Sequence, residues 1–448
     1  MKTIEIKDNQ DGVLLKDKVE NNDLLDVIKS LQDISLIHVK DLLHKCNRNV
    51  FLLSNEDKIE DKFIFWLSYA NELEKCMIHT GNIAGFVEYK GIQIDITSRF
   101  ANGKNDFFLH YMLSKVFNIN LTNLQHSEEK DKLFDFLIFL FPYYLKESFK
   151  KGIFRRYERF SYNDSHLKGT IDIPRFVRKD IPFLGKIAYN TREYTADNIL
   201  TELVRHTIEY IKVGRYKSIL VNSEISKYVK SIIESTPSYS KNKRELIINR
   251  NLKPIRHPYY SEWTDLQAIC LAILRHRKIR YSGENDNKVH GILFDVSWLW
   301  EEYLSVLLKP RGVHHTHNRT GQGRCYLFND GSAPRYPDYY SADKVFDAKY
   351  KRLGKHDSIS SIDRDDMHQM ITYMHCLKKK SGVFLYPVGN GRNEKEKDKL
   401  EEKSLNGFGG SVGAYGLKIP SCDNDSFTCF SNLMKESEDE FISRLFKN

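Results

Sequence analysis

The chain has 448 residues, of which 41% are hydrophobic and 12% aromatic, so two or three domains are expected and a disordered protein is excluded. Lys and Arg total 69 against 60 Asp and Glu, and the net charge of +9 is compatible with a polyanionic partner without requiring one. The seven cysteines are scattered and form no Cys-x-x-Cys pair, which argues against a disulfide framework or a structural zinc site and favours a reducing cytosol.

No segment has the character of a signal peptide or a membrane span. The first twelve residues lack an apolar core, as a signal peptide would require. The longest apolar stretch, Leu133–Leu145, is interrupted by Asp135 and Pro142 and is too short to cross a bilayer, so it predicts a buried helix. We therefore expect a soluble, cytoplasmic protein with no membrane contact.

Residues 1–127 are expected to form a mixed α/β module. Apolar and polar residues alternate on both sides of Gly91, which predicts a hairpin that turns at Lys90–Gly91. The spacing then becomes helical from Asp106, the expected N-terminal cap, to Phe117.

Residues 128–285 are expected to be mainly helical and to belong with the first module to a docking region. Between the helices, the basic stretch Ser238–Lys253 is either a surface turn or a nucleic-acid contact. The predicted elements are helices over 128–150, 198–213 and 260–276, and strands over 157–161 and 169–173.

Residues 286–448 are expected to form a third domain, with a small mixed sheet and helices packed on it. The charged run Glu394–Lys403 is expected to be a solvated loop or a frayed helix. The predicted elements are helices over 297–308 and 365–379, and strands over 289–296, over 382–388 and on both sides of the loop at 340–343.

The segment around Asp347 carries the pattern most indicative of chemistry. Side chains alternate between the two faces of a strand, so Asp347, Lys349 and Lys351 project from the same side, where a buried strand would normally be apolar. Asp338 lies nine positions before Asp347, which suits a neighbouring antiparallel strand after a short turn. Two carboxylates brought together in this way, with the backbone carbonyl of Ala348, form an oxygen site suited to Mg²⁺, with Mn²⁺ as an alternative ion.

The residues around this pattern strengthen it, since an isolated Asp-x-Lys is more often a surface ion pair than a nuclease site. Gln369 and Tyr373 are four residues apart and share one face of the following helix. Glu301, in an apolar helix, is a third carboxylate that could meet the metal, although the adjacent Glu302 is an alternative. Lys349 is then placed to hold or deprotonate the attacking water and to offset charge on a phosphate. The ordered set indicates a metal-dependent nuclease.

This set resembles the PD-(D/E)xK nuclease superfamily and, more narrowly, the McrC family, the nuclease subunit of McrBC-type restriction systems and of LlaJI-like relatives. The resemblance covers most of the chain. Asp347–Lys351 is joined by Leu167–Asp172, similar to a Leu-x-Gly-x-Ile-Asp element, and by Glu193–Asn198, similar to Glu-Phe-x-x-Asp-Asn. Asp295–Glu301 is similar to a stretch ending in Leu-Phe-Glu, with Trp300 in place of Phe. The polar groups of Leu167–Asp172 and Glu193–Asn198 themselves favour structural roles, in a hairpin strand and a helix cap.

The resemblance implies a Mg²⁺-dependent endonuclease that cuts double-stranded DNA together with a McrB-type AAA+ GTPase, expected to be a hexameric ring whose GTP hydrolysis it stimulates. The implied fold is a mixed α/β (α+β) chain, with an N-terminal α/β docking region followed by a PD-(D/E)xK domain. No Gly-x-x-x-x-Gly-Lys-Ser/Thr motif occurs in the sequence, so GTP is expected to act only through the partner, and no cofactor-binding residue is assigned. The residues expected to act in catalysis are Asp338, Asp347, Lys349, Glu301, Gln369 and Tyr373.

Cations near this set are candidates for contact with DNA phosphates. Lys351, Arg352 and Lys355 follow the Asp-x-Lys pattern and are interleaved with an aromatic residue, as in many nucleic-acid contacts. His314–His317 has no acidic or cysteine ligand at finger spacing nearby, so a polar loop is favoured over a metal site.

Two other functions remain compatible with the sequence. One is a stand-alone, sequence-specific restriction nuclease that needs no GTPase. The other is a non-catalytic activator of an AAA+ ring, which the intact Asp, Asp, Lys set argues against.

Overall fold

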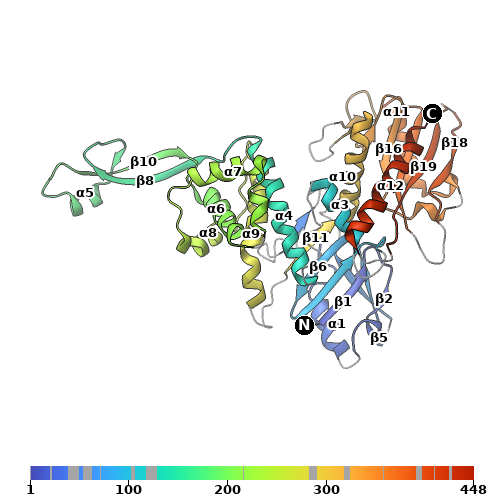
Figure 1. Cartoon of the computed structure of the whole chain (residues 1–448), viewed down its shortest axis with the longest axis horizontal. Coiled ribbons are helices and arrows are strands. Elements are labelled where there is room, and N and C mark those ends of the chain that lie inside the picture. The colour runs from blue at the N-terminus through green and yellow to red at the C-terminus, as the bar shows by residue number, and fades with distance from the viewer. Residues whose placement is uncertain are drawn as a thin grey trace. The chain divides into compact units, whose positions relative to one another are not determined.

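The computed structural model describes residues 2–20, 23–38, 50–53, 63–70, 72–101, 106–117, 129–214, 216–281, 290–316, 323–356, 358–389, 396–407, 409–422 and 426–447. It divides into two compact units, residues 1–128 with 283–448 (unit 1) and residues 129–282 (unit 2), shown in Figure 1. Residues 1–127 and 286–448, treated above as separate modules, lie in the same unit. Helices and sheets are mixed in the chain, which confirms the predicted α/β class.

One five-stranded sheet of unit 1 combines strands from both ends of that unit's sequence. The strand β11, which follows unit 2 in the sequence, pairs antiparallel with β6 and parallel with β3, so it fastens the segment after unit 2 to the N-terminal sheet. The strand order is β1 (Lys2–Lys7), β7 (Ile92–Thr97), β6 (Ile83–Tyr89), β11 (His290–Asp295) and β3 (Val50–Leu53).

The predicted hairpin at Lys90–Gly91 is confirmed. Lys90 and Gly91 have φ angles of 47° and 74°, and two positive φ angles in a two-residue turn match the twist of the flanking strands β6 and β7. Gly85 on β6 allows a close approach of β11, because a Cβ at this position would lie 2.0 Å from the carbonyl oxygen of Ile292.

A smaller antiparallel sheet and the helix α1 share a core with the five-stranded sheet in the N-terminal part of unit 1. The apolar face of α1 (Leu24–Gln32) buries Ile28 and Leu31 in the same core as Ile78 and Ile94, which come from the two sheets. The strands of the smaller sheet are β2 (Val13–Leu14), β5 (Glu72–Thr80) and β4 (Phe65–Ala70).

A six-stranded mixed sheet forms the other half of unit 1, in agreement with the predicted mixed sheet. Three of its strands, β16, β17 and β19, run parallel, β15 and β18 pair antiparallel with β16 and β19, and β12 pairs antiparallel with β15. The order is β12 (His314–His315), β15 (Tyr339–Tyr340), β16 (Lys344–Ala348), β17 (Ser381–Val388), β19 (Ser411–Lys418) and β18 (Lys399–Ser404). A separate hairpin is formed by β13 (Cys325–Tyr326) and β14 (Pro334–Arg335).

The expectation of a loop or frayed helix over Glu394–Lys403 is wrong for its second half. The residues from Lys399 onward form the edge strand β18, in which Leu400 is buried and its charged neighbours are exposed. Charged side chains are common on edge strands, where they discourage pairing with other chains, so the charge run was compatible with a strand. Glu394 lies outside the described residues.

Helices cover both faces of the six-stranded sheet. On the face of Val345, α11 (Arg364–Cys376) packs against β16 and β17. On the opposite face, Phe346 meets Phe446 of α12 (Phe427–Phe446), which packs beside α10 (Val296–Leu308) and α3 (Phe107–Phe117). Asp295 begins α10 by accepting hydrogen bonds from the backbone of Ser297 and Trp298.

Unit 2 is built on a group of helices. The helix cap expected within Glu193–Asn198 is confirmed at Asn198, whose side chain accepts hydrogen bonds from the backbone of Leu200 and Thr201. The stretch Ser238–Lys253 contains a helix with buried Ile247 and Ile248, rather than only a surface turn. The helices are α4 (Glu129–Phe149), α6 (Ile199–Val213), α7 (Ser223–Glu234), α8 (Arg244–Arg250) and α9 (Glu262–Tyr281). None of the described helices of the chain is long and apolar enough to cross a membrane. Short 3-10 helices occur in both units. Those described in unit 2 are η5 (Lys217–Leu220) and η6 (Lys241–Lys243), and those described in unit 1 are η1 (Leu15–Asp17), η7 (Lys309–Arg311), η9 (Leu353–Lys355) and η10 (Ile359–Ser361).

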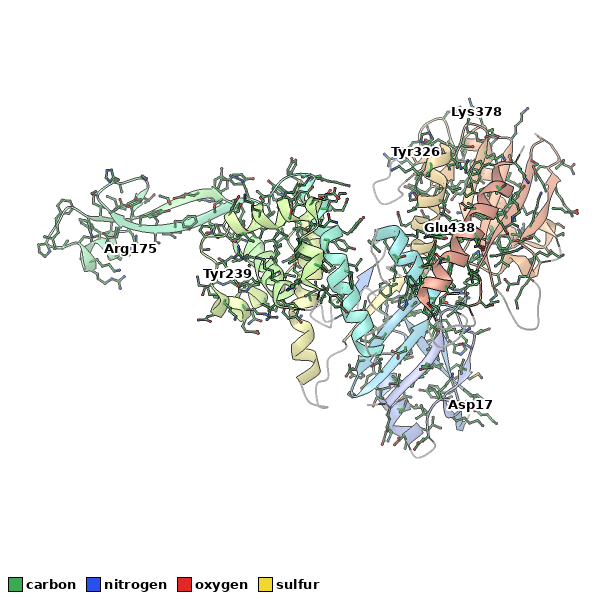
Figure 2. The ribbon with its side chains drawn as sticks, viewed as in Figure 1. Asp17, Arg175, Tyr239, Tyr326, Lys378 and Glu438 are labelled. Carbon is green, nitrogen blue, oxygen red and sulfur yellow. The ribbon has the colours of Figure 1, made fainter. Side chains whose placement is uncertain are left out.

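A long two-stranded hairpin extends from the helices of unit 2 (Figure 1), and we call residues 156–195 the arm. Arg175, labelled in Figure 2, ties the short helix near the tip of the arm to the two long strands. Its Nη2 donates hydrogen bonds to the carbonyls of Tyr162 (2.7 Å) and Tyr189 (2.8 Å). The elements of the arm are β8 (Arg156–Asp164), β9 (Thr170–Ile171), α5 (Ile173–Lys179) and β10 (Ile187–Thr195).

Asp106 is expected to make the stability of the fold depend on pH. Its carboxylate accepts hydrogen bonds from the backbone of Ser98 and Leu109, but burial raises its pKa from 3.8 to about 6. The folded state therefore binds this proton more tightly than the unfolded state, so the stabilisation is complete below about pH 4 and is lost as the pH rises through about 6.

We predict that Asp106→Asn removes this pH dependence. From about pH 4 to above pH 6, the free energy of unfolding of the wild type should fall by about 3 kcal/mol more than that of the variant. A difference in stability between the two proteins that does not depend on pH leaves this comparison unchanged. Urea denaturation between pH 4 and 7 measures both curves. Parallel curves would contradict the prediction.

Candidate active site

The pairing of β15 with β16 places Asp338 opposite Asp347. Tyr339 pairs with Phe346 in the antiparallel register, so the preceding Asp338 faces Asp347, as the spacing of nine residues predicted. Oδ2 of Asp338 accepts a hydrogen bond of 2.8 Å from the backbone N–H of Ala348. Both carboxylates are buried, with 8% and 2% of the residue exposed.

Lys349 connects this pair of strands to α11. Its Nζ lies 2.8 Å from Oδ2 of Asp347 and 3.0 Å from Oδ1 of Asp366, and it donates a hydrogen bond of 2.9 Å to Oε1 of Gln369. The backbone N–H of Lys349 donates to the carbonyl of Leu385 on β17, which holds the main chain in place beyond the end of β16. The ammonium group is therefore enclosed by groups from the strand and from the helix.

A chain of hydrogen bonds continues from Gln369 back toward Asp338. Nε2 of Gln369 donates to Oη of Tyr373 (2.6 Å), and the Tyr373 hydroxyl donates to the carbonyl of Tyr336 (2.9 Å). Tyr336 lies two residues before Asp338 in the sequence. The helix pair Gln369 and Tyr373, expected on one helix face, thus lies in the same cluster as the carboxylates.

Burial and mutual charge perturb the ionisable groups of the cluster. Burial raises the pKa of Asp347, and the nearby charges of Asp366 and Glu301 raise it further, while Lys349 opposes them. Burial works to lower the pKa of Lys349, but Asp347 and Asp366 outweigh burial and raise it. Burial disfavours ionisation of Asp366, yet Lys351 and Lys349 hold its pKa below the usual value. Lys349 therefore carries its proton, and Asp366 its negative charge, at neutral pH.

The donor atoms fit a hard divalent cation. Oδ2 of Asp347 is buried and lies 2.8 Å from the ammonium of Lys349, so this oxygen already attracts a cation. Carboxylate and carbonyl oxygens of the kind provided by Asp338, Asp347 and Ala348 are the ligands that Mg²⁺ and Mn²⁺ prefer. Within the described residues, no three His, Cys, Asp or Glu side chains already form a metal-holding group, so the fit depends on these two acids and backbone or water oxygens.

Glu301 approaches the cluster from α10. Its charge is among those that raise the pKa of Asp347, and its carbonyl accepts a hydrogen bond from the hydroxyl of Tyr339. Its Oε1 lies 3.3 Å from Nε2 of His315. The expectation of a polar loop at His314–His317 is wrong for its first two residues, because they form strand β12 beside β15, and His317 lies outside the described residues.

Asp366 and His315 were not among the predicted site residues. Asp366 precedes Gln369 by three residues and Tyr373 by seven, so helical spacing alone places all three on one face, and this signal was available in the sequence. His315 had no comparable signal, because only the pairing of β12 with β15 brings it beside Glu301.

The three DNA-phosphate candidates lie in different surroundings. Lys351 has a half-exposed side chain and pairs with Asp366 at 2.6 Å. Arg352 contacts Glu396 at 2.7 Å and donates to the carbonyl of Arg99, so its charge is engaged inside unit 1. Lys355 is exposed at the end of η9.

Comparison with known proteins assigns the family. Residues 78–387 match the family model described as "McrBC 5-methylcytosine restriction system component". The chain belongs to this family. The resemblance to the McrC family, drawn from Asp347–Lys351 and its companion elements, is thereby confirmed.

Solved structures from Thermococcus gammatolerans resemble this McrBC component. One match is a chain of a structure described as a refined half-complex from a tetradecameric assembly of McrB AAA+ hexamers with bound McrC. The match covers 97% of this chain and 99% of that chain, with a TM-score of 0.50 and 16% identity. A cryo-EM structure of the McrBC complex covers 68% of this chain and 87% of its own, with a TM-score of 0.33 and 15% identity. The first likeness shows a shared fold. No curated protein matches the chain significantly.

We predict that Lys349 and Lys351 differ in their contribution to stability, although both contact Asp366. Lys349→Met leaves Asp347 and Asp366 buried without this cation and should cost about 3 kcal/mol at pH 7. The cost should shrink as the pH falls, because the buried carboxyl group of Asp347, whose pKa is raised, takes up a proton. Lys351→Met, at a side chain that is 52% exposed, is the matched control and should cost less than about 1 kcal/mol. Chemical denaturation measures both, and equal costs would contradict this account.

Proposed function

We propose that this McrBC component is the nuclease subunit of a restriction system. In this proposal it cuts phosphodiester bonds of double-stranded DNA with Mg²⁺ and works with a McrB-type AAA+ GTPase whose hydrolysis it stimulates. The observation that carries the proposal is the juxtaposition of Asp338 and Asp347 on paired strands, with the ammonium of Lys349 2.8 Å from Asp347. This arrangement is typical of the PD-(D/E)xK nucleases, which we propose as the fold of the C-terminal half of unit 1.

The chemistry of the site follows from its groups. Asp338, Asp347 and the carbonyl of Ala348 would hold Mg²⁺, with Glu301 as an auxiliary ligand, and Mn²⁺ could replace it. The bound ion would neutralise phosphate charge and make a water molecule more acidic. Because Asp347 and Asp366 keep Lys349 protonated, we assign Lys349 to holding water or a phosphate oxygen as a cation rather than to removing a proton.

Other side chains would orient the reacting groups. Gln369 holds the ammonium of Lys349 at 2.9 Å and is itself held by Tyr373, so the pair fixes the direction of that cation. Lys351 and Lys355 are exposed beyond the strand and are the better candidates for DNA phosphates, whereas the less exposed Arg352 pairs with the buried carboxylate of Glu396.

We predict that Asp347→Asn abolishes cleavage while leaving the fold and the stimulation of the GTPase intact. The matched control is Asp343→Asn, an exposed carboxylate in the loop before β16. Cleavage of plasmid DNA with and without 5-methylcytosine, in the presence of the partner, GTP and Mg²⁺, measures the first effect. Cutting by Asp347→Asn at the wild-type rate would refute the assignment, and cutting without partner and GTP would favour a stand-alone nuclease.

Metal binding offers a readout that does not depend on cleavage. Mg²⁺ at ten times its dissociation constant should stabilise the wild type and Asp343→Asn by about 1.4 kcal/mol, since it binds only the folded state. Asp347→Asn should gain almost nothing under the same conditions. A calorimetric melting series in Mg²⁺ measures this, and an equal gain in both variants would place the ion elsewhere.

The arm of unit 2 is the element that we propose for docking to the GTPase. The helix α5 buries none of its residues, and large apolar side chains near the end of the arm face solvent. These residues are Leu167, Ile173, Val177, Ile181, Phe183 and Leu184, which are between 47% and 85% exposed. A concentration of exposed large apolar side chains in one segment, residues 167–184, is typical of a protein interaction site. The structural relative that spans nearly all of the chain is described with McrB AAA+ hexamers and bound McrC, so we commit to such a ring as the partner.

We predict that Phe183→Asp with Leu184→Asp uncouples the chain from its partner. Both side chains are exposed, so the folding stability should change by less than about 0.5 kcal/mol. Stimulation of GTP hydrolysis should fall at least tenfold, because charged groups would replace the apolar contact. Val213→Asp, at a residue of unit 2 that is 90% exposed outside the arm, is the matched control and should keep full stimulation. Undiminished stimulation by the double variant would show that the arm is not the docking element.

A further inference from the structure

The chain segment after Asp347 is held from two sides. Lys349 and Lys351 point to Asp366 on α11. Tyr350, between them, points the other way, and its Oη lies 2.6 Å from Oγ of Ser98, with which it shares a hydrogen bond. Strand alternation therefore continues past the end of β16. Lys349 and Lys351 project toward α11, and Tyr350 projects to the opposite side, which we call the anchoring side.

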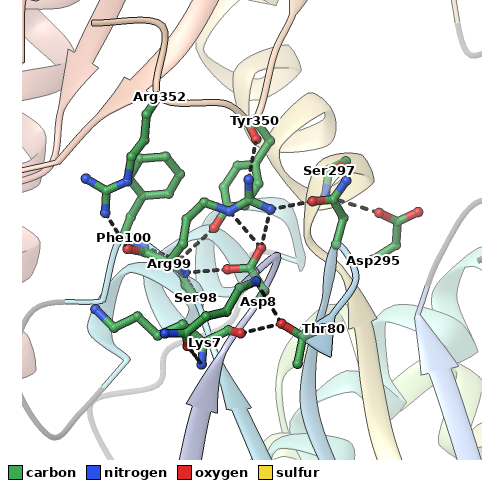
Figure 3. A network of polar contacts seen from close by, with 12 residues as sticks. Lys7, Asp8, Thr80, Ser98, Arg99, Phe100, Asp295, Ser297, Tyr350 and Arg352 are labelled. Atoms are coloured by element: carbon green, nitrogen blue, oxygen red, sulfur yellow. Dashed lines mark hydrogen bonds and ion pairs between the residues drawn. The ribbon is translucent and has the colours of Figure 1, made fainter. Parts of the chain in front are cut away.

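The anchoring side rests on the turn Ser98–Phe100, which follows β7 of the N-terminal sheet (Figure 3). The guanidinium of Arg99 lies 4.9 Å from the ring centre of Tyr350, and its Nη1 donates to the carbonyl of Tyr350 at 3.3 Å. Phe100 meets the same ring edge to face at 5.1 Å. Arg352, two residues later, donates to the carbonyl of Arg99 at 2.8 Å.

A buried ion pair between Arg99 and Asp8 holds the turn in place. Arg99 donates from Nε and Nη2 to Oδ2 of Asp8 at 2.9 and 2.6 Å, and its Nη2 also contacts the side chain of Asn82. The side chain of Asp8 is fully buried and that of Arg99 is 11% exposed. Burial raises the pKa of Asp8 and Arg99 opposes this, so the two groups depend on each other. A buried ion pair of this kind is costly to separate and fixes one geometry.

We propose that Ser98, Arg99 and Tyr350 are positioning residues for Lys349, through which the N-terminal sheet sets the place of the catalytic cation. This inference rests on the proposed nuclease function. None of the three touches the groups that would react. The ladder of β16 holds Lys349 only at its N–H, so the main chain on its other side is held by the contacts of Tyr350 with Ser98 and Arg99. Displacement of a reacting group by about 1 Å can lower a rate up to a hundredfold.

The sharpest test removes single hydroxyl groups. Tyr350→Phe and Ser98→Ala each delete one partner of the same hydrogen bond and leave Lys349, Asp347 and Asp338 unchanged. The matched control is Tyr386→Phe on β17, whose buried hydroxyl donates to the carbonyl of Lys397 at 2.6 Å, away from the Ser98–Phe100 turn. Tyr350→Phe and Tyr386→Phe each lose one hydrogen bond and should lose comparable stability, so a general loss of stability predicts the same result for these two. Ser98→Ala also loses the bond that its hydroxyl accepts from the N–H of Phe100 and should cost more.

The measurements are steady-state cleavage by the full-length chain with its GTPase, GTP and Mg²⁺, and hydrogen exchange of the peptide that contains Lys349. Tyr350→Phe and Ser98→Ala should each lower kcat about tenfold with KM for DNA unchanged within about twofold. The double variant should be no slower than Ser98→Ala, because Tyr350→Phe deletes no bond that Ser98→Ala leaves in place. The Lys349 amide should exchange about tenfold faster in these variants. Tyr386→Phe should change neither kcat nor this exchange.

Hydrogen exchange separates the failure of this inference from the failure of the proposed function. Wild-type exchange rates at Lys349 in Tyr350→Phe and Ser98→Ala would overturn the inference, as would faster exchange with an unchanged kcat. An equal loss of kcat in Tyr386→Phe would also overturn it, since the effect would then be general. If the wild type cleaves no DNA but exchange quickens in the two variants alone, the proposed function fails and the positioning of Lys349 stands.

Discussion

The balance between the ammonium of Lys349 and the buried carboxylates of Asp347 and Asp366 is the interaction on which the candidate site depends. Burial alone would favour neutral carboxyl groups. The ammonium, 2.8 Å from one carboxylate and 3.0 Å from the other, opposes this effect and joins β16 to α11 in a single contact. The arrangement costs desolvation of three charged groups, a departure from an apolar core of the kind that functional sites retain.

The rest of unit 1 can be understood as support for this cluster. The pairing of β15 with β16 places Asp347 next to Asp338, and α11 presents Gln369 from one face. From the other side, the turn at Ser98–Phe100 belongs to the N-terminal sheet, and β11 of that sheet leads directly into α10 and Glu301. The two halves of the sequence before and after unit 2 therefore contribute to one structure, which explains why they form a common unit.

Local sequence relations were enough to predict part of this arrangement. The period of two in a strand predicted that Asp347 and Lys349 share a side, and the residue count to Asp338 predicted an antiparallel neighbour. Relations between distant segments were not accessible in the same way. The pairing of β11 with the N-terminal sheet and the contact of Arg352 with Glu396 depend on tertiary structure, to which short-range patterns are blind. Asp366 was overlooked for another reason, since acidic residues in the first turn of a helix are usual whatever their function.

The central claim is that Asp338 and Asp347 form a divalent metal site beside Lys349. The most direct measurement is anomalous diffraction from crystals of the chain soaked in Mn²⁺. We expect a single strong peak within about 2.3 Å of carboxylate oxygens of both Asp338 and Asp347, with the ammonium of Lys349 still adjacent. A peak bound to other residues, or none at these carboxylates at saturating Mn²⁺, would contradict the account.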